Sequence, residues 1–460
     1  MKRGQVLELD IEKLAFGGKG IARVENRVVF VEGTVPGDRV KAKIRRIKSS
    51  YIEARLHELI KPSHLRTQAK CSHFGYCGGC KWQYLDYEQQ LHFKKEHVRE
   101  SLVHIGKIDI PAVNDTLPSP LLFGYRNKME FSFTNSRWLT LVELNNPDIK
   151  KDFGLGLHVP GKFDQIMNID TCWLQDETMN RILNLSQQYF KKSQFPIYDL
   201  KTHQGLLRFL VIRKSFYEKN YQVNVVTSEK AVEELTEYSE YLTREVPEIV
   251  SVVNTVNSRP AQIALGEAEY TITGRDFLLE KIDPFIFRLS ASSFFQTNPL
   301  QAERLYQVVK DFVGSGHNLL WDLYCGTGTI AMILSEQAKR IVGFELVESA
   351  VKDAAENCRE HEIGNCSFIG GDLRQSILGQ TETPDVVVCD PPRSGMHEDV
   401  VKAILKSNPA SIVYVSCNPT TQARDIQLLA ENYRVSAVQP VDMFPHTYHI
   451  ESVVKLERKQ

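Results

Sequence analysis

The sequence predicts an α/β fold in which a parallel, doubly wound sheet forms the C-terminal part. From residue 318 onward, apolar β runs alternate with helical stretches, and strands that alternate with helices form parallel sheets. Two different patterns precede this region. Short β runs divided by turn signals occupy residues 5–60, as in a small β-barrel. Residues 118–280 mix β-rich stretches with one or two helical segments, which is typical of an α+β domain.

These patterns divide the 460 residues into three expected domains, in line with about 150 residues per domain. We expect a β-barrel at residues 1–60, a central domain at 61–285 and the α/β domain at 286–460. The last two apolar segments, at 433–444 and 449–458, are joined without a helix. Such a connection predicts an antiparallel hairpin at one edge of the sheet.

The composition, 42% hydrophobic and 25% charged, is that of a folded protein and excludes a disordered or fibrous chain. No apolar run is long enough to cross a bilayer, and the N-terminus lacks the apolar core of a signal peptide. We therefore expect a cytoplasmic protein without a membrane partner. The net charge is only −1, but residues 1–110 contain 21 Lys and Arg against 13 Asp and Glu. This end of the chain can face a polyanion.

Cations recur at alternating positions of one predicted strand and then shift register: Arg39, Lys41, Lys43, Arg45, Arg46 and Lys48. We call this set the basic stripe. One interpretation is a surface that faces the phosphates of a nucleic acid. The other is a solvated edge strand, on which lysines prevent aggregation.

Nine cysteines in a chain without a secretion signal are expected to be reduced thiols and not a disulfide framework. Three of them lie close together at Cys71, Cys77 and Cys80, and residues 86–106 after them show helical spacing of apolar positions. Most isolated cysteines are buried small apolar residues. We expect this for four of the dispersed ones: Cys325, Cys358, Cys366 and Cys389.

In an open α/β sheet, functional groups gather just beyond the carboxyl ends of the strands. The first such end carries Asp322, Tyr324 and two glycines, Gly326 and Gly328, which let the backbone turn tightly and approach a ligand. Glu345 ends the next strand, where a carboxylate can accept hydrogen bonds from ribose hydroxyls. NAD, flavin and S-adenosylmethionine all fit this pair. The absence of a third glycine and the preceding aspartate favour S-adenosylmethionine.

Two further strand ends carry Asp390-Pro-Pro-Arg393 and Ser416-Cys417-Asn418-Pro419. A cysteine between a strand and the following helix, in a turn restricted by proline, can be exposed to a substrate. The helix N-terminus there favours the thiolate form. Cys417 is therefore a candidate nucleophile.

These segments resemble the successive motifs of the RNA (uracil-5-)methyltransferase family: FFQTNP with Gln296, DLYCGTGT, VVCDPPRSG, VSCNPTT and the terminal HIESV. The C-x5-C-x2-C cluster with a distant fourth cysteine, and the basic N-terminal barrel, are similar to the iron–sulfur-containing 23S ribosomal RNA branch with its TRAM domain. The resemblance implies a Rossmann-like methyltransferase domain that binds S-adenosylmethionine. It also implies formation of 5-methyluridine, with 23S rRNA as the expected substrate and partner of a monomeric enzyme.

The resemblance also assigns site residues. Carbon 5 of uracil is too weak a nucleophile to attack a methyl sulfonium, so a nucleophile must first add at carbon 6. Cys417 matches the family's nucleophile, and Glu451 matches the general base that removes the carbon 5 proton. The alternative for Glu451 is an edge-strand glutamate paired with a lysine. Four positions match the cofactor-binding residues of the family: Gln296, Tyr324, Glu345 and Asp390.

By the same resemblance, Cys71, Cys77, Cys80 and Cys172 are the ligands of a 4Fe-4S cluster. Four thiolates suit zinc as well. Zinc ribbons, however, prefer two C-x2-C pairs, whereas this chain has one such pair, a five-residue gap and the distant Cys172. Zinc is thus the alternative. With four protein ligands no iron is open to a substrate, which favours a structural or RNA-docking role.

Two other functions are compatible with parts of the pattern. Asp390-Pro-Pro resembles the D-P-P-Y signature of exocyclic-amine RNA methyltransferases, although Arg393 replaces the tyrosine. A non-catalytic RNA-binding assembly protein would use only the barrel and the cysteine cluster.

Overall fold

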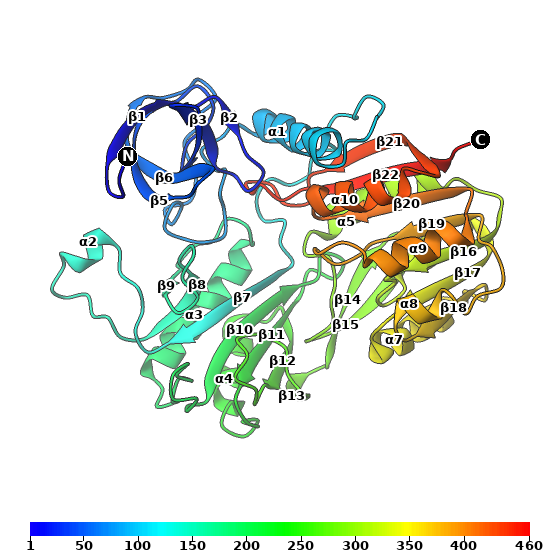
Figure 1. Cartoon of the computed structure of the whole chain (residues 1–460). Coiled ribbons are helices and arrows are strands. Elements are labelled where there is room, and N and C mark those ends of the chain that lie inside the picture. The colour runs from blue at the N-terminus through cyan, green and yellow to red at the C-terminus, as the bar shows by residue number, and fades with distance from the viewer. The chain divides into compact units, whose positions relative to one another are not determined.

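The computed structural model describes residues 1–460, which form two compact units (Figure 1). Unit 1 comprises Met1–Arg66, Leu85–Pro120 and Gln301–Gln460, and unit 2 comprises Thr67–Tyr84 and Leu121–Leu300. The units cut across the three predicted ranges, because residues 85–120 belong to unit 1. The division into domains at 1–60, 61–285 and 286–460 stays a prediction.

Unit 1 begins with a six-stranded barrel, in which the strand order is β1-β5-β6-β4-β3-β2. Its strands are β1 (Val6–Asp10), β2 (Lys13–Leu14), β3 (Gly20–Val24), β4 (Arg27–Glu32), β5 (Arg39–Ile47) and β6 (Tyr51–Lys61). Alternate residues of β5 point inward, where Val40 and Ile44 join a fully apolar core. Asp38 is buried and accepts hydrogen bonds from the Val35 and Ser63 N–H groups and from Arg66. This carboxylate fixes the chain where it leaves the barrel.

The basic stripe lies on an interior strand, because β5 pairs with β1 on one side and with β6 on the other. The edge-strand explanation of the stripe is therefore wrong. Three of its cations form ion pairs with glutamates of the barrel, at 2.7, 2.9 and 3.6 Å: Arg39 with Glu8, Lys41 with Glu58 and Arg45 with Glu32. Lys43 and Arg46 are exposed.

The predicted helix at 86–106 is present as α1 (Tyr87–Glu100), which continues as a π-helical turn at Ser101–Ile105. The Asp86 carboxylate accepts from the Glu88 N–H and caps its start. Along the helix, His97 Nε2 lies 3.1 Å from the carbonyl oxygen of Leu14 in the barrel. The ring of Phe16 contacts the rings of both His97 and Tyr448. The helix thus joins the barrel to the C-terminal part of unit 1.

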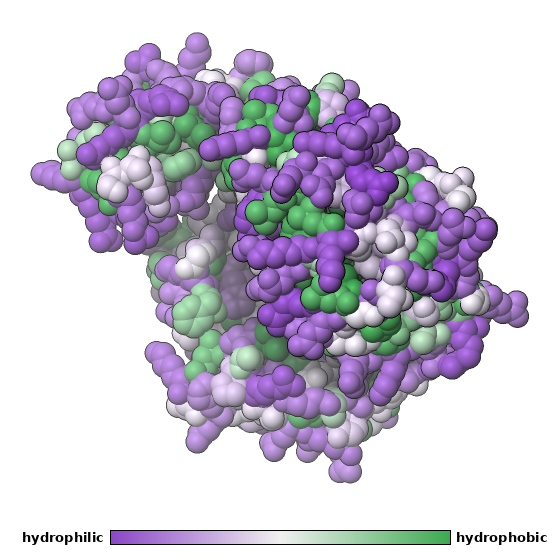
Figure 2. Space-filling view, turned by 45° about the vertical axis from the view of Figure 1, so that its right-hand side comes forward, coloured by the Kyte–Doolittle hydropathy of each residue, from purple (hydrophilic) through white to green (hydrophobic).

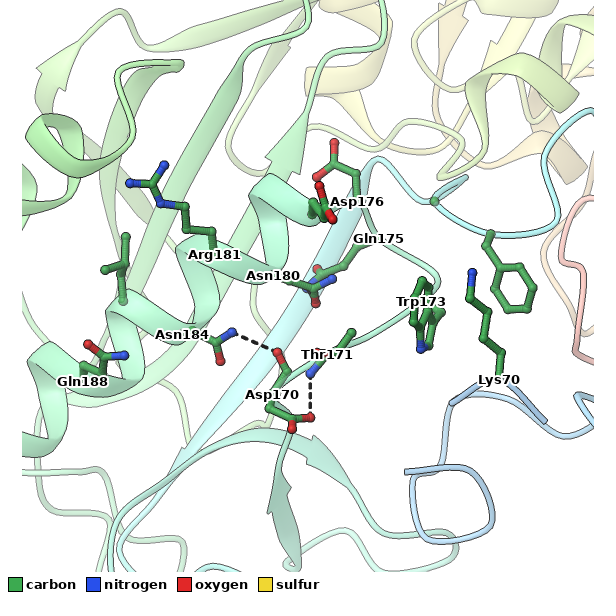
Figure 3. A pocket seen from close by; sticks show the side chains of 14 residues that line it. Lys70, Asp170, Thr171, Trp173, Gln175, Asp176, Asn180, Arg181, Asn184 and Gln188 are labelled. Carbon is green, nitrogen blue, oxygen red and sulfur yellow. Dashed lines mark hydrogen bonds between the residues drawn. The ribbon is translucent and has the colours of Figure 1, made fainter. Parts of the chain in front are cut away.

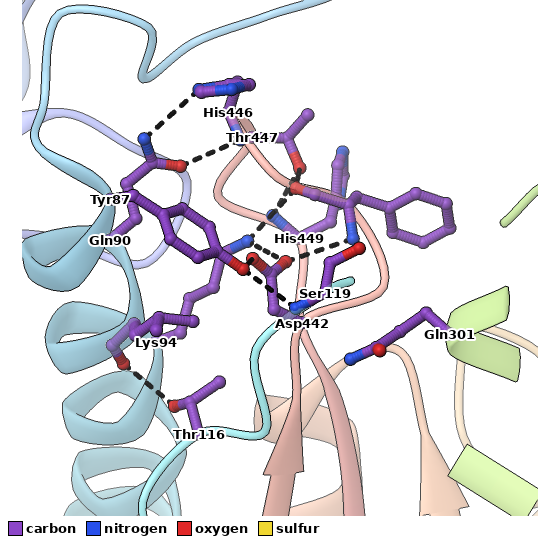
Figure 4. A network of polar contacts seen from close by, with 12 residues as sticks. Tyr87, Gln90, Lys94, Thr116, Ser119, Gln301, Asp442, His446, Thr447 and His449 are labelled. Atoms are coloured by element: carbon purple, nitrogen blue, oxygen red, sulfur yellow. Dashed lines mark hydrogen bonds and ion pairs between the residues drawn. The ribbon is translucent and has the colours of Figure 1, made fainter. Parts of the chain in front are cut away.

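A buried polar network anchors α1 to the loop that precedes the last strand (Figure 4). Lys94 and Asp442 have no exposed side-chain surface, and Lys94 Nζ donates to Asp442 Oδ1 at 2.5 Å and to the Phe444 carbonyl at 3.1 Å. Tyr87 donates to the other oxygen of Asp442 at 3.0 Å. Gln90 accepts from the His446 N–H at 2.8 Å. One helix therefore holds the backbone of residues 442–446.

The C-terminal part of unit 1 is a seven-stranded sheet with the order β18-β17-β16-β19-β20-β22-β21. Its strands are β16 (His317–Leu323), β17 (Ala338–Glu345), β18 (Cys366–Gly370), β19 (Val386–Cys389), β20 (Ser411–Ser416), β21 (Tyr433–Val441) and β22 (Glu451–Arg458). The first five are parallel, and β22 runs antiparallel between β20 and β21. This arrangement confirms both the predicted doubly wound sheet and the predicted hairpin at its edge.

Helices connect the parallel strands, as expected for such a sheet (Figure 1). They are α6 (Thr329–Ile333), α7 (Glu348–Glu360), α8 (Leu373–Ser376), α9 (Glu398–Ser407) and α10 (Pro419–Leu429), and α5 (Pro299–Val313) precedes the first strand. The core between sheet and helices includes Trp321, Phe344 and Tyr414. The π-helical turn after α1 adds Leu102 to the same core.

Unit 2 is built on a second seven-stranded sheet, with the order β13-β12-β11-β10-β7-β8-β9. The strands are β7 (Lys128–Thr134), β8 (Gly154–His158), β9 (Ile166–Asn168), β10 (Leu207–Lys214), β11 (Tyr221–Thr227), β12 (Ile249–Val256) and β13 (Ala268–Gly274), and a ribbon of β14 (Phe277–Ile282) and β15 (Phe285–Ser290) follows. Its helices are α2 (Leu141–Leu144), α3 (Glu177–Lys192) and α4 (Thr236–Glu245). This mixture agrees with the expected α+β character.

Hydrophilic side chains cover most of the surface visible in Figure 2, and hydrophobic ones form small separate patches. No helix combines the length and the apolar character needed to cross a bilayer.

The Lys94–Asp442 pair gives a test of how unit 1 is held together. Replacing Asp442 by Ala leaves a buried ammonium group without its carboxylate partner, and we expect a loss of about 3–5 kcal/mol of stability. The double variant Lys94→Met/Asp442→Leu should recover most of this loss, because it removes both charges. Urea unfolding followed by tryptophan fluorescence measures the difference.

The exposed pair between Lys95 of the same helix and Asp115, at 2.9 Å, is a matched control. Asp115→Ala should change stability by less than about 1 kcal/mol. If Asp442→Ala is as mild as this control, the buried pair does not anchor the loop.

Candidate functional site

Four strand ends of unit 1 meet at one edge of its sheet, because β16, β17, β19 and β20 are parallel neighbours. The connections from β16 lead to β17 on one side, while β19 lies on the other side. A strand order that reverses in this way leaves a crevice in which α/β proteins bind ligands.

The turn after β16 has a backbone that few residues adopt. Tyr324, Gly326 and Gly328 have φ values of 64°, 52° and 81°. A Cβ atom at Gly328 would lie 3.0 Å from the side chains of Ala354 and Phe368, so a larger residue would have to displace them in addition to adopting the positive φ. At Gly326, by contrast, a Cβ atom would meet nothing within 4 Å. The turn therefore exposes backbone next to open space, as close approach to a ligand requires.

Glu345 connects two of the strand ends. Its carboxylate accepts from the Gly326 N–H at 3.0 Å and from the Val347 N–H at 2.9 Å. Each oxygen keeps a second lone pair for another donor. The side chain is thus held in one orientation at the crevice, where the sequence predicted a contact with ribose hydroxyls.

Asp322 is fully buried at the end of β16. Neither carboxylate oxygen has a hydrogen bond of good geometry, although the Ala331 N–H faces the carboxylate. Burial, and next the charge of Asp390, raise the pKa of Asp322 well above its usual range. A buried polar group without a partner is costly, so this carboxylate suits a ligand that donates hydrogen bonds or carries positive charge.

The register of two antiparallel strands places Glu451 beside Cys417. Ser416, the last residue of β20, pairs with Ser452 of β22, so the next residues on the two chains, Cys417 and Glu451, stand opposite each other. Glu451 is only 6% exposed and lies on an interior strand. The alternative for Glu451, an edge-strand residue paired with a lysine, is therefore wrong.

Three neighbouring acidic groups have raised pKa values at this position. Burial raises the pKa of Asp390 to about 7. Burial, and next Asp390, raise the pKa of Glu451 well above its usual range, while Arg393 acts in the opposite direction. Burial, followed by Glu451 and Asp390, raises the pKa of Cys417 to about 11.

The expectation that the helix N-terminus favours a Cys417 thiolate is thus corrected. Burial and two carboxylates outweigh the favourable contribution of Arg393 and of the backbone N–H. In the free protein Cys417 is a thiol at neutral pH.

Asn418 ties the loop that bears Cys417 to the loop after β19. Its Nδ2 donates to the Arg393 carbonyl at 3.1 Å, and its Oδ1 accepts from the Thr420 N–H and caps α10. The Arg393 guanidinium lies 3.0 Å from His449 Nδ1, two residues before Glu451. No sequence pattern marked His449 itself as a site residue. Its place in the motif with Glu451 was the available signal.

Two of the predicted cofactor residues remain to be placed. Tyr324 is half-buried in the turn after β16, and burial raises its pKa. Gln296 belongs to unit 2, in the segment between β15 and α5. Its part in the site stays a prediction.

The four cysteines of the predicted cluster lie together in unit 2. Burial is the largest cause of the raised pKa of all four thiols, and neighbouring cysteines of the set raise the pKa of Cys77, Cys80 and Cys172 further. The pKa reaches about 11 for Cys77 and about 12 for Cys80. The Gly79 N–H donates to Cys77 Sγ at 3.3 Å, and Gln83 Nε2 donates to Cys80 Sγ at 3.2 Å.

No three of these side chains converge on one point as the ligands of a single metal ion do. In unit 1, Cys325, Cys358 and Cys389 are buried, and Cys366 is half-buried beside Cys358.

The comparisons with known proteins agree with this geometry. The tRNA (Uracil-5-)-methyltransferase family profile matches residues 272–459, and the TRAM domain profile matches residues 1–57. An uncharacterized RNA methyltransferase of Bacteroides thetaiotaomicron is 42% identical over 456 residues, which cover 96% of this chain and 100% of the relative. This chain belongs to the tRNA (uracil-5-)-methyltransferase family.

A solved structure extends the similarity over the whole length of this methyltransferase. The crystal structure of the Pyrococcus abyssi tRNA (uracil-54, C5)-methyltransferase with S-adenosyl-L-homocysteine covers 98% of this chain and 100% of its own, with a TM-score of 0.77 and 28% identity. The α/β fold with an N-terminal TRAM domain is confirmed. The protein is an S-adenosylmethionine-dependent RNA uracil-5-methyltransferase. The family match does not support the non-catalytic or the exocyclic-amine alternative.

The raised pKa of Cys417 predicts slow alkylation at neutral pH. The rate should increase with pH up to about pH 11, because only the thiolate reacts with iodoacetamide. Glu451→Gln removes an anionic neighbour and should shift this profile to lower pH, whereas Arg393→Gln removes a cation and should shift it to higher pH. Mass spectrometry of the peptide with Cys417 measures the rate. A profile centred near pH 8.5 in the wild type would contradict the structure.

Proposed function

We propose that this methyltransferase forms 5-methyluridine through a covalent bond between Cys417 and carbon 6 of the target uracil. The observation that carries the proposal is the strand register, which sets Cys417 opposite Glu451. A nucleophile and a base that face each other can act on adjacent carbons of one ring. Asp390 and Arg393 influence the pKa of both groups, so all four side chains share one site.

The residues at the crevice fit S-adenosylmethionine. The open backbone at Gly326, the oriented Glu345 carboxylate and the unsatisfied Asp322 offer acceptors to a cationic ligand. We propose Gln296, Tyr324, Glu345 and Asp390 as its binding residues. S-adenosylmethionine supplies the methyl group that becomes bonded to carbon 5.

In the proposed reaction, the Cys417 thiol gives its proton to the solvent, and the thiolate sulfur then adds to carbon 6. The electron pair of the C5–C6 double bond moves toward the carbonyl at carbon 4, and carbon 5 becomes a nucleophile. After methylation, carbon 5 carries both a methyl group and a proton. Glu451 removes that proton, the C5–C6 double bond forms again, and the sulfur leaves carbon 6 as a thiolate.

The raised pKa values of Asp390, Glu451 and Cys417 have a use in this reaction. A ligand with positive charge beside them lowers the pKa of every one, which favours the thiolate when the site is filled. A base must also accept a proton from carbon, and a carboxylate of raised pKa does so more readily. The uridine must leave its RNA stack to reach both groups.

The division of labour between Cys417 and Glu451 is testable. Cys417→Ala should abolish both adduct formation and methylation, because carbon 5 is never activated. Glu451→Gln should allow addition and methyl transfer but stall elimination, so that a methylated RNA remains bonded to Cys417. Denaturing electrophoresis after incubation with RNA and radiolabelled S-adenosylmethionine separates the two variants.

We expect a labelled, slowly migrating band for Glu451→Gln and none for Cys417→Ala. A Glu451→Gln enzyme that turns over at the wild-type rate without this band would show that another group is the base.

We further propose that the substrate is 23S rRNA and that the enzyme acts as a cytoplasmic monomer. The support is the cysteine cluster together with the TRAM barrel, which resemble the ribosomal RNA branch. The Pyrococcus abyssi enzyme acts on uridine 54 of tRNA, so tRNA is the competing substrate. Mapping 5-methyluridine in both RNAs from a strain without this protein decides between them.

We propose that Cys71, Cys77, Cys80 and Cys172 bind a 4Fe-4S cluster. The thiols face one another, and N–H groups donate to two of the sulfurs, as protein groups commonly do at iron–sulfur sites. In such a cluster each thiolate binds its own iron, so the sulfurs need not converge on one point as they do around zinc. The cluster would cross-link two loops that are about ninety residues apart in the sequence.

Protein purified without oxygen should therefore be brown, and Cys172→Ser should remove the colour. Cys366→Ser, which replaces a half-buried cysteine of unit 1, is the control and should keep it. Metal analysis that finds stoichiometric zinc and no iron in the wild type would exclude the cluster.

The basic stripe is proposed to bind RNA phosphates, and its ion pairs allow a graded test. Lys43 and Arg46 are exposed, so Lys43→Gln and Arg46→Gln should each reduce the salt dependence of RNA affinity by about one unit of slope. Arg39 is already paired with Glu8, and Arg39→Gln should reduce it less. Affinity titrations at several salt concentrations give these slopes. Unchanged slopes in all three variants would show that the stripe is only a solvated face.

A further inference from the structure

Unit 2 contains a pocket that the proposed chemistry does not use (Figure 3). It has a volume of about 710 Å³ and lies between residues 170–177 and one face of α3. This volume is within the range of small-molecule binding sites. Cys172 of the proposed cluster lies in the same loop, between two pocket residues, Thr171 and Trp173.

Hydrogen bonds from α3 hold this loop rigidly. Asn180 Oδ1 accepts from the Cys172 N–H and from Gln175 Nε2, both at 2.8 Å, and Asn180 Nδ2 donates to the Cys172 carbonyl at 3.2 Å. Asn184 Nδ2 donates to the Asp170 carbonyl at 2.9 Å. The pocket is therefore formed before any ligand binds, which lowers the entropic cost of binding.

Gln175 lines the pocket and contains a buried acceptor that has no hydrogen-bond partner. The side chain is 3% exposed, and its Oε1 has no hydrogen-bond partner. The orientation of the amide follows from its neighbour: the backbone N–H of Cys172 requires an oxygen at Asn180 Oδ1, and that oxygen requires a donor from Gln175. A ligand with an N–H group would satisfy this buried carbonyl.

Trp173 forms an aromatic wall of the pocket. Lys70 Nζ lies 3.6 Å from its ring centroid and 5.0 Å from that of Phe123. Figure 3 shows Lys70 on one side of Trp173 and Gln175 and Asn180 on the other. One face of the indole is thus occupied by a cation, and the opposite face is turned toward the interior of the pocket.

The charges around the pocket favour an anionic group at its mouth. Asp176 is paired with Lys214 at 2.9 Å, and Asp170 is paired with His73. Lys70 and Arg181 also line the pocket, are exposed and form no ion pair. Glu177 is the remaining carboxylate of the lining. A planar ring with N–H donors and a phosphate matches the aromatic face, the acceptor and the cations together.

We propose that this pocket binds one unpaired nucleotide of the RNA substrate other than the target uridine. The base stacks on Trp173, an N–H of its edge donates to Gln175 Oε1, and its phosphate contacts Lys70. Aromatic stacking with a nearby cation is a common way to hold single-stranded RNA. The inference rests on the proposed function for the choice of RNA as ligand, and it gives the loop with Cys172 an RNA-docking role.

Oligoadenylate of ten nucleotides tests the pocket on the full-length protein, because it contains no uridine that can be methylated. It should bind and quench tryptophan fluorescence. Trp173→Leu should weaken binding about tenfold, whereas Trp173→Phe should keep the affinity within about threefold but lose the quenching. Gln175→Met, which removes the acceptor at similar size, should weaken binding severalfold.

Lys70→Gln should reduce the salt slope of oligoadenylate binding by about 0.7 to 1, and Lys70→Arg should restore it. Lys191→Gln, at the other end of α3, is the matched control and should leave the slope unchanged. Equal affinity of the wild type and Trp173→Leu for oligoadenylate would overturn the proposal. Quenching of tryptophan fluorescence by decaglutamate but not by oligoadenylate would also overturn the proposal, because it would indicate an acidic protein partner.

The result is independent of the methylation chemistry. The covalent adduct in Glu451→Gln tests the proposed reaction, and oligoadenylate binding tests only this pocket. A protein that fails the first test and passes the second would still have the RNA pocket.

Discussion

The antiparallel pairing of β22 with β20 is the constraint on which the arrangement of the site depends. Parallel strands bring their carboxyl ends to one edge of a sheet, so they gather Asp322, Glu345, Asp390 and Cys417 there. An antiparallel strand begins where its neighbour ends. The start of β22 therefore adds Glu451 to residues that lie at or just beyond the ends of the parallel strands. A shift of one residue in this register would turn Glu451 to the opposite face of the sheet.

This arrangement concentrates acidic groups where water is largely excluded. Asp322, Asp390 and Glu451 are all destabilised as anions by burial, and each raises the pKa of at least one neighbour. Perturbed carboxyl groups of this kind cluster at functional sites, although structural networks also produce them. Here the surrounding fold holds them in place. The buried pair Lys94–Asp442 fixes residues 442–446, and Asn418 fixes the loops of Cys417 and Arg393 to each other.

Local patterns in the sequence were sufficient to predict the elements but not their long-range pairing. The alternation of apolar runs and helical stretches from residue 318 onward predicted the parallel sheet. The two last apolar segments, which no helix separates, predicted the hairpin. The interior position of β5 could not be predicted, because it depends on long-range pairing with β1 in addition to the local pairing with β6. For the same reason the sequence predicted the cations of the basic stripe but not the glutamates of other strands that pair with them.

The protonation of the site residues also could not be predicted from neighbouring residues in the sequence. A helix N-terminus next to Cys417 favours a thiolate, yet burial and two carboxylates from other strands dominate in the folded chain. The role of Lys94 is a similar case, since a lysine among polar residues of a surface helix looks solvent-exposed in the sequence. Its partner, Asp442, is 348 residues away.

That separation has a consequence for the synthesis of the chain. Unit 1 is completed by residues 301–460, so its two earlier segments, Met1–Arg66 and Leu85–Pro120, emerge from the ribosome long before their partners. At about 5–20 residues per second, roughly 17 to 70 s pass between the appearance of Lys94 and that of Asp442. During this interval the residues of the barrel's apolar core are all present, whereas Lys94 lacks the Asp442 carboxylate with which it pairs. Unit 2, whose residues all appear earlier than the C-terminal sheet, can fold in the meantime. The residues of the barrel and of unit 2 are therefore all present in the nascent chain before α1 meets the loop that anchors it.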